Sequence, residues 1–212
     1  MANEYLPVGL SLKVRSCLVV GGGKVALRKI ETLLDYDSQI TVVAPEPDEK
    51  ITYYAEKGKL QLKQRAYRSP EAQQYGLVIS ASDDAGVNET VHRDCRDTGV
   101  PINVVDNPAM CDVVFPAVLK RDCLTVAVAT DGKAPFLSGH LRLILENVFP
   151  KRWSMLAKQA AQFRTKLYRH FKDQPEKRTA AIERFLEADW QTLLKDKNSD
   201  EIEQEVDRIL KG

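Results

Sequence analysis

Residues 16–34 read SCLVVGGGKVALRKIETLL and contain, in order, an apolar run, three glycines and an amphipathic segment. The apolar run at residues 17–20 is typical of a buried strand. After the glycines, apolar side chains recur at the spacing of one helix face: Ala26, Ile30, Leu33 and Leu34. A strand, a glycine turn and a helix in this order form the phosphate-binding part of a dinucleotide-binding unit.

Three positions match the pattern G-x-G-x-x-A: Gly21, Gly23 and Ala26. We expect Gly21 to permit the tight turn, Gly23 to let the backbone approach a pyrophosphate, and Ala26 to let helix and strand pack closely. The N-terminus of the helix then offers free N–H groups and a partial positive charge to the phosphates. Glycine triplets also occur in flexible loops that bind nothing, but the sequence on both sides favours a cofactor turn.

The chain has 212 residues, 43% of them hydrophobic and 29% charged, with a formal net charge of +1. These values are ordinary for one or two domains with a sizeable core, and they do not indicate bulk nucleic-acid binding. Residues 1–13 lack the basic start and apolar core of a secretory signal, and no apolar run is long enough to span a membrane. We therefore expect a cytoplasmic protein.

The four cysteines form no C-x-x-C pair, so we expect neither a zinc site nor an iron–sulfur cluster, and no metal-ligating residue is predicted. Cys17, Cys95 and Cys123 fall in or beside predicted strands and helices, where buried free thiols in a reducing compartment are common. Cys111 is the exception, because it lies in a loop near the predicted site.

Four further apolar segments predict strands: residues 39–44, 60–64, 77–81 and 102–105. Strands that alternate with helices imply a parallel sheet covered on both faces. The expected fold class is therefore α/β, an NAD-binding Rossmann-like parallel sheet followed by a small α+β dimerisation region and a helical C-terminal domain.

The pattern changes after the fifth strand. Residues 113–119 and 124–130 predict two strands joined by a polar turn at residues 120–122, and helices follow Pro135. One of these helices is expected to carry the apolar residues Ile182, Phe185, Leu186 and Leu193.

The expected domains are an NAD-binding domain at residues 1–112, a dimerisation region at residues 113–150 and a helical domain at residues 151–212. Another apolar stripe lies on the first helix after the hairpin: Leu137, Leu141, Leu145 and Val148. This stripe and the free edges of the hairpin need cover, so we predict a homodimer.

A nicotinamide cofactor usually meets an acid at the end of the second strand, about 20 residues beyond the glycines. This chain has Ala44-Pro45 there, and its first acid is Glu46. The 2′-phosphate of NADP needs a basic residue nearby, whereas Glu46, Asp48 and Glu49 would repel it, so we expect NAD. Glu46, or the backbone around it, is the predicted ribose contact, and an ordinary exposed loop acid is the alternative.

The loop after the fourth strand, ASDD at residues 81–84, should face the same cofactor, because ligands of open α/β sheets bind at the carboxyl ends of the strands. Asp83 and Asp84, with Asn88, have a second interpretation as caps of the next helix. The predicted cofactor-binding residues are Gly21, Gly22, Gly23, Lys24, Val25, Ala44, Pro45, Glu46, Ser82 and Asp83.

The fifth strand leads into NVVDNP at residues 103–108, which places Asp106 at its carboxyl end. A carboxylate there, beside the change in topology, is suited to acid/base catalysis. Taken alone, Asp106 is more typical of a turn-forming residue before Asn107 and Pro108.

With these residues, the chain resembles the precorrin-2 dehydrogenase and sirohydrochlorin ferrochelatase family, the N-terminal module of siroheme synthases. The matching segments are LPV from Leu6, LVVGGGKVALRK from Leu18, ITVVAP from Ile40, VISASDD from Val78, NVVDNP from Asn103, VFPAVLKRD from Val114, TDGKAP from Thr130, LR at Leu141 and LE at Leu145. The resemblance covers residues 5–150 in order. NVVD followed by FPA and a T-x-G-x-x-P loop is far more specific than the glycines.

The resemblance implies an oxidoreductase that converts precorrin-2 to sirohydrochlorin with NAD, and it gives Asp106 the role of proton-transfer group. Some members also insert ferrous iron, so a bifunctional dehydrogenase and ferrochelatase is the alternative. A non-catalytic NAD-sensing module is the rival from another class. Such a module needs the ribose acid and has no use for NVVD and FPA, which is the reverse of this sequence.

The implied substrate is a macrocycle with many carboxylates, which needs scattered cations in a wide cleft. The predicted substrate-binding residues are Asn103, Lys120, Arg121, His140 and Arg142, although each basic residue alone is commonly a solvated surface charge. Two features depart from the family. Ala134 stands where the family loop T-G-G-x-S-P has serine, so a phosphorylation-type control loses its hydroxyl. The methyltransferase domain of some trifunctional relatives does not fit in 212 residues.

Overall fold

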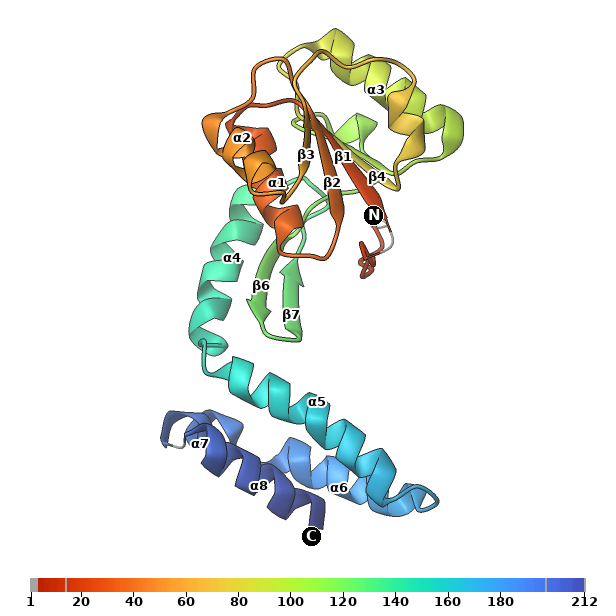
Figure 1. Ribbon diagram of the computed structural model, residues 1–212. Helices are drawn as coiled ribbons and strands as arrows, with labels where there is room; N and C mark the ends of the chain where they lie inside the picture. Colours follow the sequence, from red (N-terminus) through yellow and green to blue (C-terminus); the bar gives the residue numbers. More distant parts are fainter. Residues whose placement is uncertain (1–3, 14, 197, 212) are drawn as a thin grey trace. The chain divides into compact units, whose positions relative to one another are not determined.

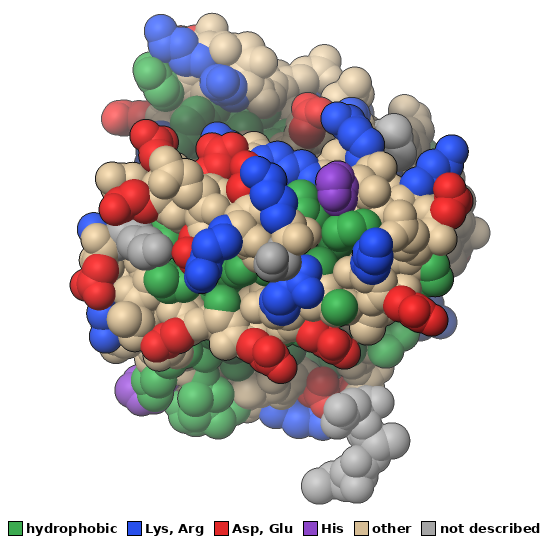
Figure 2. All heavy atoms as spheres, turned by 90° about the horizontal axis from the view of Figure 1, so that it is seen from below, with side chains coloured by type: hydrophobic (Ala, Val, Ile, Leu, Met, Phe, Trp, Pro, Cys, Tyr) green, Lys and Arg blue, Asp and Glu red, His purple; other side chains and the backbone are tan. Residues whose placement is uncertain are grey.

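The structure is a computed structural model that describes residues 4–13, 15–196 and 198–211. The chain folds into two compact units, Met1–Val114 and Phe115–Gly212, each with its own hydrophobic core. None of the helices within the described ranges combines the length and the apolar character needed to cross a bilayer. On the face shown in Figure 2, Lys and Arg side chains are interspersed with Asp and Glu side chains, in keeping with the net charge of +1.

The first unit contains a five-stranded parallel sheet with the strand order β3-β2-β1-β4-β5. Its strands are β1 (Ser16–Val20), β2 (Gln39–Val43), β3 (Gln61–Lys63), β4 (Leu77–Ser80) and β5 (Ile102–Val104). The order reverses at β1, which pairs with β2 on one side and with β4 on the other. Open α/β sheets bind their ligands at such a reversal. The sequence-based prediction of an α/β parallel sheet is confirmed.

Three helices and one short 3₁₀ helix connect these strands: α1 (Lys24–Leu34), α2 (Glu49–Glu56), η1 (Glu71–Gln74) and α3 (Ala85–Thr98). A second 3₁₀ helix, η2 (Pro108–Met110), follows β5. Figure 1 shows α1 and α2 on one face of the sheet and α3 on the other. α1 buries Ala26, Ile30 and Leu33, as the helical spacing predicts. α3 ends at Gly99, whose φ of +70° suits glycine because it has no Cβ atom.

The core between the sheet and α3 is built from apolar side chains of both layers. Its buried members are Leu18, Val20, Val43, Ala72, Val78, Val91, Cys95, Val100, Ile102 and Val104. Met110 and Cys111, from the loop after β5, pack against this core and are only partly buried. The loop that follows the last strand is therefore anchored to the body of the first unit.

The second unit begins with an antiparallel hairpin of β6 (Ala117–Arg121) and β7 (Leu124–Val128), against which α4 (Pro135–Val148) packs. Four further helices form a bundle: α5 (Trp153–His170), α6 (Pro175–Glu187), α7 (Trp190–Asp196) and α8 (Ser199–Lys211). The bundle core includes Phe163, Leu167 and Ile202. Trp190 also lies in this core, and its indole N–H donates to the carbonyl of Phe185 (2.6 Å).

The hairpin is shorter than the sequence predicts. β6 begins at Ala117, because the N–H groups of Asp112 and Val113 donate to the carbonyl of Ile102 (2.9 and 3.1 Å) and close the loop after β5 instead. The predicted turn at residues 120–122 is also displaced. Residues 120 and 121 belong to β6, and the turn is formed by Asp122, at φ +58°, and the residue after it.

The single helix predicted over residues 182–193 is divided into α6 and α7, which are separated by residues 188 and 189. The apolar stripe is not a buried face, because Leu186 is 73% exposed and Ile182 is 39% exposed. The core positions are instead Ala181, Trp190 and Leu194. The predicted division into three domains, with boundaries after residues 112 and 150, stays a prediction.

Candidate functional site

The glycine turn between β1 and α1 is closed on two sides by neighbouring loops. Gly21 has a φ of +117°, and a Cβ atom there would lie 2.2 Å from the carbonyl oxygen of Ala81. A Cβ atom on Gly22 would lie 2.7 Å from the carbonyl oxygen of Glu46 and 2.8 Å from the Cβ atom of Ala44. Both positions therefore require glycine, the first for its conformation and its contact, the second for space.

Gly23 differs from the other two glycines. It is the N-cap residue of α1, at φ −80° and ψ −175°, and no described atom lies within 4 Å of the position of its missing Cβ. The first turn of α1, which begins at Lys24, has N–H groups without acceptors inside the helix, and such groups attract phosphate. The open space at Gly23 and the start of α1 fit the pyrophosphate of a dinucleotide.

Hydrogen bonds bring the loops after β2 and β4 to this turn. The N–H of Gly21 donates to the carbonyl of Val43 (3.0 Å), and the N–H of Asp48 donates to the carbonyl of Gly22 (2.8 Å). The N–H of Ala81 donates to the last carbonyl of β1 (2.7 Å). The structure thus brings together the three segments that the sequence assigns to the cofactor.

The side chains in these loops divide into exposed ones and ones that support the turns. The predicted cofactor residues with exposed side chains are Lys24, Pro45, Glu46 and Asp83. Asp84 caps α3, since its Oδ1 accepts from the N–H of Gly86 (2.8 Å). Asn88 donates from Nδ2 to the carbonyl of Ser82 (2.8 Å) and so braces the loop. The capping interpretation therefore applies to Asp84, and Asp83 remains at the surface.

Asp106 follows β5 at one edge of the same sheet, and it is exposed. Its φ of +59° lies in the left-handed region, where non-glycine residues are uncommon and aspartate is among those that tolerate it. The N–H of Val105 still extends the sheet by donating to the carbonyl of Ser80 (2.9 Å), and the N–H of Asn107 donates to the carbonyl of Val104 (3.3 Å). The chain therefore turns at Asp106, at the carboxyl end of the sheet.

Asn103, predicted to bind substrate, lies in β5 and is 7% exposed. Its Nδ2 donates to the carbonyl of Val113 (2.9 Å) and approaches the Sγ of Cys111 at 3.5 Å. Its Oδ1 is buried and has no hydrogen-bond partner among the described residues. The nitrogen of this amide therefore supports the loop, and the oxygen is a buried acceptor that no described residue satisfies.

Lys29, on α1, interacts electrostatically with Asp106 and Cys111, although its sequence context does not single it out. Burial lowers the pKa of its ammonium and Arg28 lowers it further, while Cys111 and Asp106 oppose the change. These opposing effects place the ammonium within electrostatic reach of the Asp106 carboxylate. The signal in the sequence was weak, because a lysine beside the buried Ile30 is common on an amphipathic helix.

The basic residues predicted to bind substrate lie in the second unit, whereas Asn103 lies in the first. Arg121 donates from Nε to the carbonyl of Phe149 (2.7 Å), which ties β6 to the end of α4. Arg142 forms an ion pair with the acid one turn further along α4. Lys120 on β6 and His140 on α4 are exposed. The four residues thus occupy two adjacent elements of one unit.

The loop before α4 contains the departure from the family pattern. Ala134 is the N-cap residue of α4, and its N–H donates to the Oγ1 of Thr130 (3.1 Å). Asp131 and Gly132 have φ values of +50° and +72°. These left-handed conformations give a physical reason for two glycines in the family loop. The cap therefore relies on a threonine hydroxyl, and Ala134 adds no polar group.

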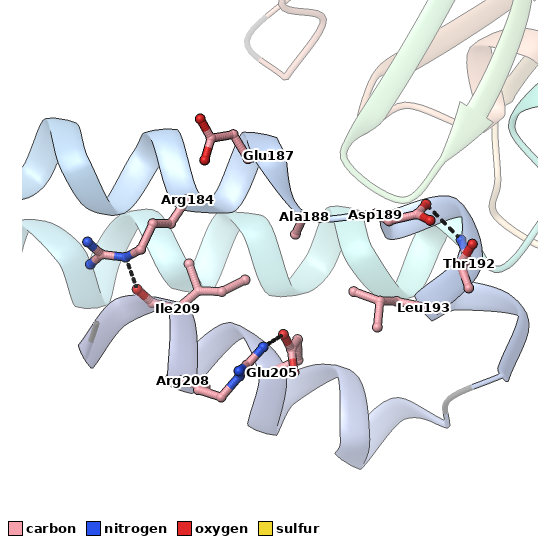
Figure 3. A pocket seen from close by; sticks show the side chains of 9 residues that line it. All are labelled: Arg184, Glu187, Ala188, Asp189, Thr192, Leu193, Glu205, Arg208 and Ile209. Carbon is pink, nitrogen blue, oxygen red and sulfur yellow. Dashed lines mark hydrogen bonds and ion pairs between the residues drawn. The ribbon is translucent and has the colours of Figure 1, made fainter.

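A cavity of about 460 Å³ lies between α6, α7 and α8 in the second unit, and Figure 3 shows its lining side chains. Its arginines are engaged within the bundle, because Arg184 donates from Nε to the carbonyl of Ile209 (3.1 Å) and Arg208 pairs with Glu205. No predicted site residue lines this cavity. Over the described part of the chain, no group of three or more His, Cys, Asp or Glu side chains is placed to hold a metal ion.

The switch-point sheet and its glycine turn define a dinucleotide-binding α/β protein. Residues 8–117 match the model of a family described as "Putative NAD(P)-binding", and the chain belongs to this family. Its cofactor is a nicotinamide dinucleotide, for which the open position at Gly23 leaves room.

The chain is also similar to individual named proteins. The chain is 39% identical over 184 residues to a siroheme synthase of Methylococcus capsulatus and 41% identical over 175 residues to one of Pseudomonas putida. These alignments cover 87% and 82% of this chain but 39% and 38% of the relatives, so the chain spans less than half of their length. Among solved structures, SirC, a precorrin-2 dehydrogenase, shares the fold with a TM-score of 0.79 at 24% identity, over 96% of this chain and 100% of that one.

Proposed function

We propose that the protein catalyses the NAD-dependent dehydrogenation of precorrin-2 to sirohydrochlorin. The observation that carries the proposal is Asp106, which follows the last strand of the sheet whose glycine turn fits a dinucleotide. The similarity to siroheme synthases supports this choice of substrate. The reaction class is therefore the oxidation of a reduced tetrapyrrole.

Side chains of the protein and the bound cofactor have different roles in this reaction. The bound nicotinamide supplies a hydride acceptor. Asp106, as a carboxylate, accepts the proton that the macrocycle must lose together with the hydride. Lys29 contributes a positive charge close to that carboxylate. Asn103, which the sequence assigns to the substrate, would act from beneath the site by holding the loop that carries Asp106, since its Nδ2 donates to the carbonyl of Val113 (2.9 Å).

The cofactor is proposed to lie along the carboxyl ends of β1, β2 and β4. The backbone at Gly23 and the first turn of α1 would hold the pyrophosphate. Glu46, or the backbone beside it, would contact a ribose, and the loop at Ser82 and Asp83 would border the nicotinamide half. Carboxylates of the macrocycle would be met by the basic residues of the second unit: Lys120, Arg121, His140 and Arg142.

The direct test is an anaerobic reaction of precorrin-2 with NAD, followed by absorbance of both the macrocycle and the reduced cofactor. We expect one equivalent of reduced nicotinamide for each sirohydrochlorin formed. A protein that binds NAD but leaves precorrin-2 unchanged would be a nucleotide-sensing module, and the proposed reaction would be wrong.

We predict that NAD is preferred over NADP by about tenfold or more in kcat/KM, because acidic side chains repel a 2′-phosphate and each factor of ten is about 1.4 kcal/mol. Glu46 and Glu49 are exposed near the end of β2. Asp48 is partly occupied as the cap of α2, where its side chain accepts from the N–H of Lys50 (2.9 Å). Glu46→Arg should raise the efficiency with NADP, and Glu56→Arg, at the far end of α2, is the matched control. Equal efficiency of the wild-type protein with both cofactors would refute the prediction.

We predict a homodimer in which α4 contributes to the interface. Exposed apolar side chains are concentrated on this helix: Phe136, Leu137, Leu141, Leu143, Ile144 and Val148. Exposed apolar side chains gathered in this number on one helix are typical of an interaction surface. Sedimentation at micromolar concentration should give twice the mass of the chain, and Leu141→Asp should give the monomer. Leu186→Asp, which alters a leucine exposed on α6, is the control and should remain dimeric, whereas a monomeric wild-type protein would contradict the prediction.

A further inference from the structure

The thiol of Cys111 lies within the loop that carries Asp106. The N–H of Val104 donates to its Sγ (3.2 Å), and the Nδ2 of Asn103 approaches the same atom at 3.5 Å. The Sγ also lies 3.2 Å from the carbonyl oxygen of Val104 and 3.3 Å from that of Asn107, and its single proton serves one of the two at a time. One side chain at the end of the loop thus contacts residues on both sides of Asp106.

These contacts satisfy backbone N–H and carbonyl groups of β5 that have no hydrogen-bond partner within the sheet. β5 is an edge strand, and its ladder partner is β4 alone. The N–H of Val105 faces β4 and donates to the carbonyl of Ser80 (2.9 Å), whereas the N–H of Val104 donates to the Cys111 thiol. The thiol therefore takes the place of a missing strand at Val104, the last residue of β5 and two positions before Asp106.

The surroundings of Cys111 suit a structural hydrogen-bond donor. Burial raises the pKa of its thiol, which keeps the proton in place, although the hydrogen bond with Val104 and the charge of Lys29 work against this effect. The hydroxyl of Tyr5 donates to the carbonyl of Cys111 (3.1 Å), and the residue packs against the core of the first unit. The neighbouring amide is held by the same loop, because the Nδ2 of Asn103 donates to the carbonyl of Val113 (2.9 Å), while its buried Oδ1 has no partner among the described residues.

We propose that Cys111 is a positioning residue, whose thiol holds the loop in the left-handed turn that sets the direction of the Asp106 carboxylate. The inference deepens the proposed dehydrogenation and rests on it for its effect on turnover. In this role the thiol contacts neither the macrocycle, which gives up the hydride, nor the nicotinamide, which accepts it. It acts through the backbone at Val104 and Asn107.

The kinetic test compares Cys111→Ala, Cys111→Ser and Cys95→Ala in the full chain. We expect Cys111→Ala to lower kcat by about tenfold to a hundredfold, since small displacements of a catalytic group have effects of this size, with the KM for NAD unchanged. Serine can make the same hydrogen bonds, so Cys111→Ser should recover most of the loss. Cys95 is a fully buried thiol of α3 in the same core, and its alanine variant controls for lost packing. If Cys111→Ala and Cys95→Ala behave alike, the positioning role is wrong.

A second measurement tests the loop without any turnover. In Cys111→Ala, hydrogen exchange at the amide of Val104 should accelerate by about tenfold or more, because its acceptor is gone, while the amide of Val105 stays protected by β4. Unchanged exchange at Val104 would overturn the inference. If the wild-type protein fails to oxidise precorrin-2, but the amide of Val104 still loses protection in Cys111→Ala, the proposed function is wrong. The structural role of the Cys111 thiol in the loop is then still supported.

Discussion

Asp106→Asn is expected to lower the turnover of precorrin-2 by about a hundredfold or more, the usual effect of losing a general acid or base. The substitution removes the carboxylate but retains the shape of the side chain. Asparagine also tolerates the left-handed conformation found at φ +59°, so folding and NAD affinity should be retained. Steady-state kinetics with precorrin-2 and a separate NAD titration measure the two effects.

The comparison with Asp106→Ala separates chemistry from conformation. Alanine in the left-handed region costs about 1 kcal/mol, so this variant should lose stability as well as turnover. Asp122, at φ +58° in the turn of the hairpin, provides the matched control, because Asp122→Ala imposes a similar backbone cost within the second unit. An Asp106→Asn protein that oxidises precorrin-2 at the wild-type rate would show that the residue only forms a turn and that the proton goes elsewhere.

Gly23→Asp should abolish NAD-dependent turnover without harming the apoprotein. The added carboxylate would occupy the open space at the start of α1 and repel the pyrophosphate. Aspartate at an N-cap stabilises a helix by a few tenths of a kcal/mol relative to glycine, so the first unit should be as stable as before or slightly more stable. Saturating NAD, at a hundred times its Kd, stabilises the wild-type fold by about 2.7 kcal/mol, and the variant should show no such effect.

The neighbouring glycine gives the opposite expectation and serves as the control. A Cβ atom on Gly21 would lie 2.2 Å from the backbone carbonyl of Ala81, and the φ of +117° is unfavourable for any other residue. Gly21→Ala should therefore destabilise the first unit even in the absence of cofactor. Thermal unfolding followed by far-ultraviolet circular dichroism, with and without NAD, distinguishes the two variants. If NAD strongly stabilises the Gly23→Asp protein, the assignment of Gly23 to the pyrophosphate site is wrong.

The turn from β1 into α1 could be predicted because its pattern is contained in one short stretch, where an apolar run, three glycines and a helix-spaced apolar face follow one another in residues 17–34. The positive φ of Gly21 and the close packing at Gly22 leave glycine as the residue that fits, and Ala26 follows on the buried face of the same helix. The end of α3 is similar, since Gly99 takes the left-handed conformation that helix ends commonly need. In these segments a short stretch of sequence predicts the local structure, although the atoms that exclude a Cβ at Gly21 and Gly22 belong to the loops at Ala81 and Glu46.

The support around Asp106 could not be predicted, because it depends on contacts between segments distant in the sequence. The charge of Lys29 on α1, more than 70 positions earlier in the chain, interacts with that of Asp106. Nothing in the sequence at Cys111 indicates that its thiol meets the edge of β5. The start of β6 was misplaced for a related reason, since residues 112 and 113 satisfy the carbonyl of Ile102 rather than a partner strand.

Both tryptophans of the chain belong to the second unit, Trp153 at the start of α5 and Trp190 within the bundle core. Indole fluorescence will consequently report on the bundle alone. The nicotinamide-binding unit contains no tryptophan, so it will give no signal when only indole is excited. A denaturant titration followed in parallel by fluorescence and by far-ultraviolet ellipticity will give coincident curves if the units melt as one body. Separate midpoints would instead assign the fluorescence transition to α5–α8 and the remaining ellipticity change to the parallel sheet with its helices.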